Sequence, residues 1–410
     1  MKSIGFRELV TLTAVMMACQ AVGIDVMLPA LPTIGAALGL TAANRAQLIV
    51  LTYMMGLGAG QLFWGILSDR YGRRRILLLG VGSYSIAALL CSTTGSFSAL
   101  LAWRFLHGLA ASSVVVARSV IRDLYSGTRM ARVMSLTFIV FLISPVLAPS
   151  LGQLLLLVAP WRWLFVAIAL FGAGVWCWSL LRLPETLHAE YRLQLDRARV
   201  AHALRLVLGH RAALWYTVAI TAVLGALLAY VSMVQQIFTD VFHRPRLMPG
   251  IFAICAAAMG VTSYLNSRVV ERMGMRSISH GGLLVLLGAS LLHLVLSMLG
   301  ADPLIVFTLL QAITLACVGL IFANFGTVAM EPMGEVAGLA ASLQGFLTTM
   351  GGALIAALIG HSYRGSIVPL ALGTSLCTLL AIGCVLLAEQ GRMFRDPELA
   401  PDAARVSPPM

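Results

Sequence analysis

The chain has 410 residues, of which 60% are hydrophobic and only 11% are charged, and its net charge is +12. A soluble globular domain carries about 25% charged residues, so the composition argues against a soluble enzyme and indicates a polytopic helical membrane protein. Lys2 is the single lysine, and most arginines lie in short segments between apolar runs. Membrane topology therefore explains the positive charge better than nucleic-acid binding does.

Twelve apolar runs are each long enough to cross a hydrocarbon core of about 30 Å. We predict spanning helices over residues 9–35, 45–66, 76–94, 98–122, 133–157, 162–182, 212–237, 248–267, 279–299, 303–327, 337–360 and 366–388. The expected fold class is an all-α polytopic membrane protein with twelve transmembrane helices. All seven cysteines lie inside apolar runs without the spacing of a disulfide or metal site, so we expect no metal.

The first span contains Asp25, the only acid inside a predicted span. An ionised aspartate at the centre of a spanning helix costs about 2.5–3.5 kcal/mol, and a proton or a cation can neutralise it. Asp25 is therefore our first candidate for proton coupling. Pro29 and Pro32 leave two alternatives: they kink the span, which places Asp25 near mid-depth, or they end it, which places Asp25 near the outer mouth. We expect this span to be retained rather than cleaved as a signal peptide.

The second span leads into the string GILSDRYGRRR at residues 65–75. Gly65 allows close helix approach, Gly72 permits a tight turn, and Asp69 can accept charged hydrogen bonds. A short loop that follows the positive-inside rule explains Arg70 and Arg73, but it does not require an acid just before the arginines. We predict that these five residues take part in conformational gating.

The fourth span contains RFLHGLAA at residues 104–111. Buried Arg104 stays charged and needs a partner, and Asp25 is the obvious candidate, so we assign both residues to proton coupling. The alternative is that Arg104 extends to the outer interface. His107 is better explained as a packed residue than as a proton relay. Asp123 lies at the end of this span.

The fifth span contains Pro145, Pro149 and Gly152, which introduce a bend and are further gating candidates. Residues of the predicted cavity combine soft or aromatic surface with isolated polar groups; the candidates are Met27, Tyr53, Tyr230, Gln235 and Asn324. Each of them is also explained by packing. The glycines at 56, 58 and 60 indicate a close-packing helix face rather than a nucleotide loop, and those at 338, 345, 351 and 352 would supply a complementary surface.

An internal repeat divides the chain into two halves. The strings DRYGRR (69–74) and ERMGMR (271–276) follow the second and eighth spans and carry acid, arginine, glycine and arginine in the same order. We predict an N-terminal half over residues 1–183, a linker over 184–211, a C-terminal half over 212–390 and a tail over 391–410. Arginines concentrate on one side of the predicted topology, so both termini are expected in the cytoplasm.

These strings resemble those of a known family. Residues 65–75 resemble the signature GxLaDrxGrr of the major facilitator superfamily, residues 104–111 its span-4 motif, and residues 144–153 its antiporter motif, although Gln153 replaces the usual second glycine. DVMLPALP at 25–32, PET at 184–186 and GLAASLQG at 338–345 are similar to the Bcr/CflA drug-resistance group. The resemblance to the superfamily implies that Asp123 joins Asp69 and Arg73 in a charge cluster, with solvated helix-end charges as an equal alternative.

The resemblance implies a secondary transporter, not an enzyme, that exports amphipathic drugs of the phenicol or bicyclomycin kind in exchange for protons. It implies a bacterial inner-membrane location, no cofactor beyond the proton gradient, a small-molecule substrate, no nucleic-acid partner and a monomeric state in the lipid bilayer. Two alternatives remain open: a proton-coupled exporter of a metabolite such as a siderophore, amino acid or sugar, and a non-transporting membrane sensor or scaffold.

Overall fold

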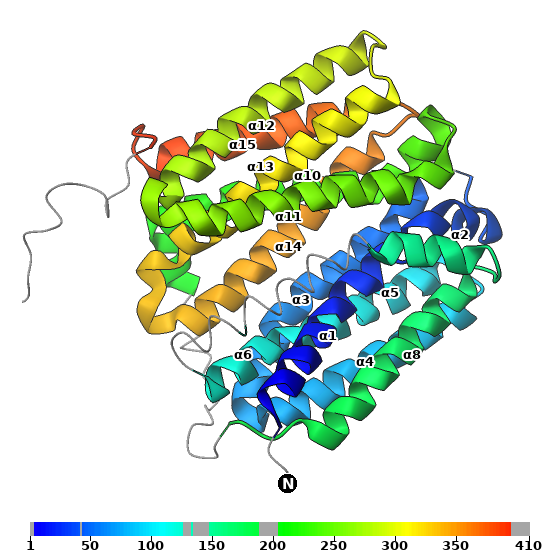
Figure 1. Cartoon of the computed structure of the whole chain (residues 1–410), viewed down its shortest axis with the longest axis vertical. Coiled ribbons are helices and arrows are strands. Elements are labelled where there is room, and N and C mark those ends of the chain that lie inside the picture. The colour runs from blue at the N-terminus through cyan, green and yellow to red at the C-terminus, as the bar shows by residue number, and fades with distance from the viewer. Residues whose placement is uncertain (1–3, 42, 126–132, 134–146, 188–203, 395–410) are drawn as a thin grey trace, which may run out of the picture.

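The computed structural model describes residues 4–41, 43–125, 133, 147–187 and 204–394 (Figure 1). Within these ranges, eleven helices are long and apolar enough to cross a membrane. The twelfth expected span, residues 133–157, lies mostly outside the described residues, and its described part forms the apolar helix Leu147–Leu156. The all-helical class predicted from the sequence is confirmed.

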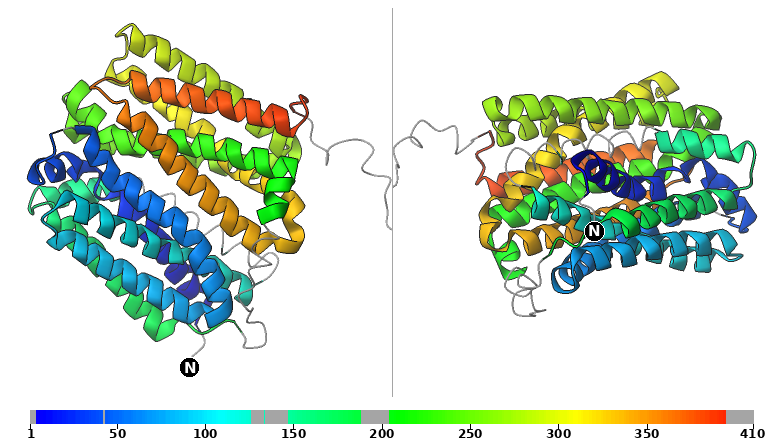
Figure 2. Two further views of the ribbon diagram at one scale, coloured as in Figure 1. Left: turned by 180° about the vertical axis from the view of Figure 1, so that it is seen from behind. Right: turned by 60° about the horizontal axis from the view of Figure 1, so that its bottom comes forward.

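The helices form two groups that lie side by side (Figures 1 and 2). The N-terminal group contains α1 (Phe6–Asp25), α2 (Leu31–Ala37), α3 (Leu48–Tyr71), α4 (Arg73–Thr93), α5 (Phe97–Ala111), α6 (Val115–Leu124) and α8 (Arg162–Arg182). The C-terminal group contains α10 (Arg211–Gln236), α11 (Met248–Met273), α12 (Met275–Met298), α13 (Leu304–Met330), α14 (Ala337–His361) and α15 (Val368–Ala388). Much of the predicted linker lies outside the described residues, and the predicted domain limits stay predictions.

The first span is broken but continues past its prolines. After α1 ends at Asp25, Pro29 lies in the short 3-10 helix Leu28–Ala30 and Pro32 lies in the first turn of α2. Proline has no amide hydrogen, so it fits the start of a helix but interrupts the middle of one. Phe6–Ala37 thus forms one apolar span in three pieces, and Asp25 lies at the first break.

Close packing between helices depends on glycines at different faces of α3. A Cβ atom on Gly56 would overlap Phe105 O of α5, and one on Gly60 would overlap Ser112 Oγ, which follows α5. Gly58 instead faces α14 at Met350. Only Gly58 therefore faces the helix that the sequence proposed as the partner of all three glycines.

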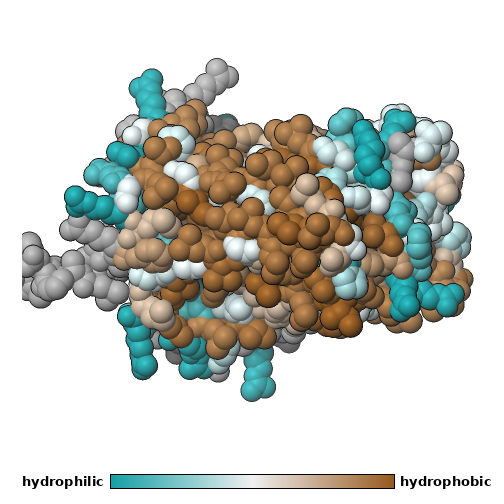
Figure 3. Space-filling view, turned by 90° about the horizontal axis from the view of Figure 1, so that it is seen from above, coloured by the Kyte–Doolittle hydropathy of each residue, from teal (hydrophilic) through white to brown (hydrophobic). Residues whose placement is uncertain are grey.

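Hydrophobic side chains cover the middle of the face in Figure 3, and hydrophilic side chains lie toward its two ends. Many large apolar residues on these helices are exposed, among them Leu79, Leu181 and Leu358. A soluble protein seldom exposes apolar patches of this extent, whereas lipid covers them without cost. The surface therefore agrees with a chain that crosses a membrane several times.

Candidate functional site

Asp25 lies at the C-terminal end of α1 and is only 5% exposed. Within the described residues, its carboxylate makes no hydrogen bond and no ion pair. A buried carboxylate without a cation or donor is costly when ionised. The break in α1 thus places a single acid where a change of protonation has a large energetic effect.

Arg104 of α5 is fully buried and does not pair with Asp25. Its Nη1 donates to Gly23 O at 2.9 Å, and its Nε donates to Ile49 O at 3.1 Å. The last backbone bond of α1 runs from Val26 N to Val22 O, so Gly23 O is among the terminal carbonyls that a helix leaves without an amide partner. The predicted Asp25–Arg104 pair is therefore wrong for this structure, because the guanidinium bonds the carbonyl two residues before the acid.

The alternative in which Arg104 extends to the interface is also excluded by its burial. Aromatic rings surround the guanidinium instead: its Cζ lies 4.3 Å from the centre of the Tyr53 ring and 5.8 Å from that of Phe165. Such contacts stabilise a buried cation by a further 1–2 kcal/mol, roughly. Arg104 is held by carbonyl oxygens and ring faces, with no acid among the described residues.

His107, one turn after Arg104, belongs to the same cluster. Its Nδ1 lies 3.1 Å from Arg104 Nη1 and accepts from it, because a guanidinium only donates. Its ring packs edge-on against Tyr53, with ring centres 5.1 Å apart, and at a tilt against Tyr84, with ring centres 4.4 Å apart. Among the described residues, His107 Nε2 and Arg104 Nη2 have no partner. We name this set the Arg104 cluster: Tyr53, Tyr84, Arg104 and His107.

A second cluster, the Arg73 cluster, lies where α3 turns into α4. Arg73 is 4% exposed; its Nη1 pairs with Asp69 and donates to Ser68 Oγ at 2.7 Å, and its Nε pairs with Asp123 Oδ2 at 3.2 Å. The structure thus brings together the three residues that the sequence proposed. Arg70 lies outside this cluster, exposed over the Tyr71 ring.

Glu185, beyond the end of α8, completes the Arg73 cluster and was not among the predicted site residues. Its Oε1 accepts from Arg73 N at 2.8 Å and from Leu187 N at 3.1 Å. Gly72 has φ +98°, and a Cβ atom there would overlap Glu185. The only signal in the sequence was the string PET at 184–186, because nothing local shows that residue 185 reaches residue 73.

The C-terminal group repeats the arrangement with different residues. Arg276 Nη2 pairs with Glu331 Oε2 at 3.0 Å and its Nε with Glu389 Oε1 at 2.9 Å. Glu331 follows α13 as Asp123 ends α6, and Glu389 follows α15 as Glu185 follows α8. Tyr216 Oη donates to Glu389 at 2.8 Å and lies 2.9 Å from His280 Nε2. The two clusters lie at corresponding helix ends but do not use the aligned positions of the internal repeat, because Arg276 aligns with Arg74 and the partners of Arg276 are Glu331 and Glu389 instead of Glu271.

Of the bend residues in the fifth span, Pro145 lies outside the described residues, whereas Pro149 and Gly152 lie in helix Leu147–Leu156. A Cβ atom on Gly152 would overlap the carbonyl oxygen of Val26. Glycine thus allows this helix to touch the backbone immediately after Asp25. Gly65, the remaining glycine of the gating set, faces Ser342 of α14.

The cavity candidates are buried but scattered. Met27 and Tyr53 lie in the N-terminal group, and Tyr230, Gln235 and Asn324 lie in the C-terminal group. Asn324 forms two 3.0 Å hydrogen bonds with Asn266, which explains it as a structural pair. Tyr230 contacts the Cys255 thiol, whereas Gln235 Oε1 has no partner among the described residues, so Gln235 is the better candidate for a ligand.

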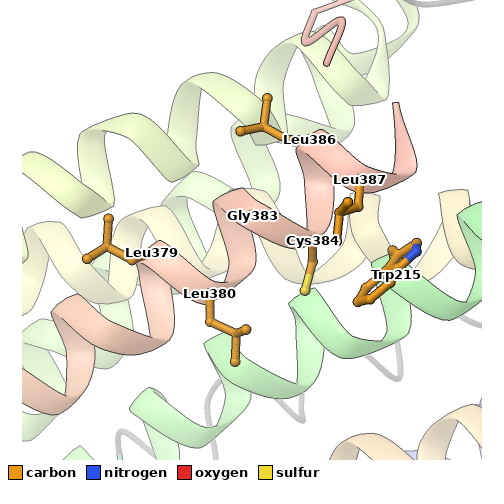
Figure 4. Close-up of a pocket in the computed structure, with 7 residues that line it drawn as sticks. All are labelled: Trp215, Leu379, Leu380, Gly383, Cys384, Leu386 and Leu387. Carbon is orange, nitrogen blue, oxygen red and sulfur yellow. The ribbon is translucent and has the colours of Figure 1, made fainter. Parts of the chain in front are cut away.

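An open groove of about 670 Å³ lies elsewhere, between α15 and Trp215 of α10 (Figure 4). Leucines and Cys384 of α15 line it. None of the site candidates borders it, and its lining is almost wholly apolar. The groove is separate from the Asp25 region.

Comparison with known proteins gives consistent results. The sequence profile of the Major Facilitator Superfamily matches residues 13–357. Multidrug resistance protein MdtL of Escherichia coli K12 is 31% identical, covering 88% of this chain and 91% of its own. A bicyclomycin resistance protein homolog of Haemophilus influenzae is 28% identical, covering 88% of this chain and 90% of the homolog. Among solved structures, a D-xylose-proton symporter superposes with a TM-score of 0.75 at 12% identity, covering 94% of this chain and 98% of the symporter.

Proposed function

The chain belongs to the major facilitator superfamily and is of the Bcr/CflA drug-resistance type, and from this premise we propose that it exports amphipathic drugs in exchange for protons by alternating access. It is a multi-pass membrane transporter, not an enzyme. The relatives named for multidrug and bicyclomycin resistance support the drug-export part of the proposal. The proton part rests on Asp25.

The observation that carries the proposal is the burial of the Asp25 carboxylate without a donor or cation among the described residues. When the site faces the cytoplasm, Asp25 releases its proton and drug binds. When it faces outward, a new proton neutralises Asp25 and the drug leaves. The protonated and ionised forms differ in their affinity for drug and for each conformation, and coupling requires such a difference.

Arg104 acts in this scheme as a positioning residue. Its bond to Gly23 O holds the broken end of α1 against α5 and so fixes the place of Asp25. The gating set supports the conformational step: Asp69, Arg73 and Asp123 hold α3, α4 and α6 together at one end. Gly65, Arg70, Gly72, Pro149 and Gly152 shape the adjoining helices, and Pro145, which lies outside the described residues, stays a proposed member of the set.

The proposed substrates are phenicol-like or bicyclomycin-like compounds. Met27, Tyr53 and Tyr230 offer soft and aromatic surface, and Gln235 offers an isolated polar atom, which is the combination that promiscuous pockets use. We place the transporter in the bacterial inner membrane as a monomer with both termini cytoplasmic, driven by the proton gradient without a cofactor.

The test uses purified protein in proteoliposomes with an imposed pH gradient and a panel of a phenicol, bicyclomycin, an amino acid, a sugar and a siderophore. We expect gradient-driven drug uptake in wild type and its loss in Asp25→Asn. Asp240→Asn is the matched control, because Asp240 is an exposed acid that accepts only from Tyr363 among the described residues.

Each alternative has its own outcome. Full gradient-driven drug transport by Asp25→Asn would contradict the proton assignment. Transport of a metabolite but of no drug would indicate a dedicated metabolite exporter. Absence of both substrate and proton flux in wild type would favour a sensor or scaffold.

A further inference from the structure

Helix α3 of the N-terminal group and helix α14 of the C-terminal group pack along their whole length. Gly65 faces Ser342, Gly58 faces Met350, and Gln47, just before α3, faces Gly360. Residue numbers rise along α3 as they fall along α14, so the helices are antiparallel. The contact positions on α3 recur at intervals that keep them on one helix face.

The side-chain amides of two glutamines on this face contact glycines of α14. A Cβ atom on Gly360 would overlap Gln47 Oε1, and one on Gly345 would overlap Gln61 Oε1. Any other residue at either glycine would push the amide away. The two sites are therefore alike: in each, a glutamine amide occupies the space that a side chain larger than that of glycine would fill.

The hydrogen bonds of the two glutamines differ. Gln47 Nε2 donates to Gln236 Oε1 at 2.5 Å, and both residues are buried. Gln236 is the last residue of α10, and a five-residue π-helix, Ile237–Val241, follows it directly. Gln61 Nε2 donates to Thr349 Oγ1 at 3.1 Å within the α3–α14 contact itself. Gln47 therefore ties α3 to a second helix of the other group, whereas Gln61 ties it only to α14.

Their positions differ as well. Gln47 is at the start of α3, and Gln61 is near its middle, about 21 Å farther along at 1.5 Å per residue. Asn44 Nδ2 adds a bond to His361 O at 3.3 Å at the Gln47 end. A tilt of about 15° centred on Gln61 would move Gln47 by about 5 Å, enough to break its bond while leaving the central contact in place.

We propose that Gln47, Gln236 and Gly360 form a latch that opens in each transport cycle, and that Gln61, Thr349 and Gly345 form the pivot about which the two helix groups tilt. The inference rests on the alternating access of the proposed function. Neutral amides suit this role, because separating them leaves no unpaired charge in a low-dielectric interface, unlike the breaking of an ion pair.

The first test links each contact covalently in a cysteine-free background. Gln47→Cys with Gln236→Cys, joined by a short thiol-reactive cross-linker that reductant can cleave, is expected to lower drug transport at least tenfold. Reductant should restore it, which excludes misfolding. Gln61→Cys with Thr349→Cys, cross-linked in the same way, is expected to keep transport. Unimpaired transport with the first link, or loss of transport with the second, overturns the proposal.

The second test does not depend on a substrate. Spin labels at Ala37, the end of α2, and at Ser362, just after α14, report the distance between the groups at the Gln47 end. Gly360→Ala is expected to raise the population with the longer distance about fivefold, as for the loss of one buried hydrogen bond. Gly250→Ala is the control, because a methyl there meets nothing within 4 Å.

An unchanged distance distribution in Gly360→Ala would contradict the latch. The two tests also separate the inference from the proposed function. A distance change in a protein that transports no drug keeps the latch and removes the drug assignment. Gradient-driven drug transport that the Gln47–Gln236 cross-link leaves unimpaired removes the latch alone.

Discussion

Two buried arginines of the N-terminal group, Arg73 and Arg104, are held by opposite kinds of partner. Arg73 lies between Asp69 and Asp123 at the end of the helices. Arg104 lies among helix carbonyls and aromatic rings, and no acid pairs with it in the described part of the chain. The first guanidinium is neutralised by acids and the second is not.

The difference separates a site that fixes helix ends for the conformational step from a site that we assign to proton coupling. An arginine between two acids at a helix end holds those helices together, and the acids neutralise its charge. An arginine held by carbonyls keeps a positive charge that no acid of the described ranges compensates, near a buried acid that is also unpaired within those ranges. Such an arrangement costs stability, so we attribute it to transport and not to folding.

The largest effect is expected from Arg104→Lys. Lysine keeps the charge, but its single ammonium cannot bond the Gly23 and Ile49 carbonyls in the fixed geometry of the guanidinium. Loss of these charge-assisted bonds should lower the drug transport rate about 100-fold, measured in proteoliposomes. Exposed Arg268→Lys is the control. A rate near that of wild type would show that Arg104 does not position the end of α1.

Next is Arg73→Gln, which leaves two acids facing each other without a cation. Because Asp69 and Asp123 are partly exposed, solvent reduces the penalty, and we expect a loss of about 2 kcal/mol in the free energy of unfolding. Thermal unfolding in detergent measures it. Adding Asp123→Asn should recover part of the loss, and an additive double variant would contradict the ion-pair explanation.

Gly72→Ala should destabilise by about 1–2 kcal/mol, because alanine disfavours a positive φ. Its Cβ atom would also overlap Glu185. The same unfolding measurement applies, with Gly95→Ala as the control, since a methyl at this exposed position meets nothing within 4 Å. Equal stability of the two variants would show that the turn adapts and that Glu185 is not held in place by it.

The smallest effect is expected from Tyr216→Phe, in the C-terminal cluster around Arg276. The change removes the hydroxyl that bonds Glu389 and contacts His280, while Arg276 keeps both acids. We expect a loss of about 1 kcal/mol in unfolding free energy with transport largely retained. Tyr71→Phe on the exposed end of α3 is the control. Loss of transport in Tyr216→Phe would give the cluster around Arg276 a direct role in transport and weaken the contrast between Arg73 and Arg104.

Local features of the chain were readable without a structure. Hydropathy predicted the spans because a helix of about 20 apolar residues has the length that crosses the hydrocarbon core of a membrane. The string at residues 65–75 predicted the Asp69–Arg73 pair because acid, turn and arginine lie within a few residues of one another, whereas Asp123 was added by the family resemblance. The partners of Arg104 were not predictable in this way, because a backbone carbonyl has no signature in the sequence.

The sequence by itself determined a polytopic helical membrane protein, the single acid of the first span and the repeated arginine strings, since each follows from residue type and spacing along one segment. Only the tertiary structure decided that Arg104 binds Gly23 O and not Asp25, that Glu185 reaches Arg73, and that Gln47 and Gln61 sit on glycines of α14. The physical reason is that these contacts join residues more than 80 positions apart, where distance in space is set by helix packing and not by the order of the chain.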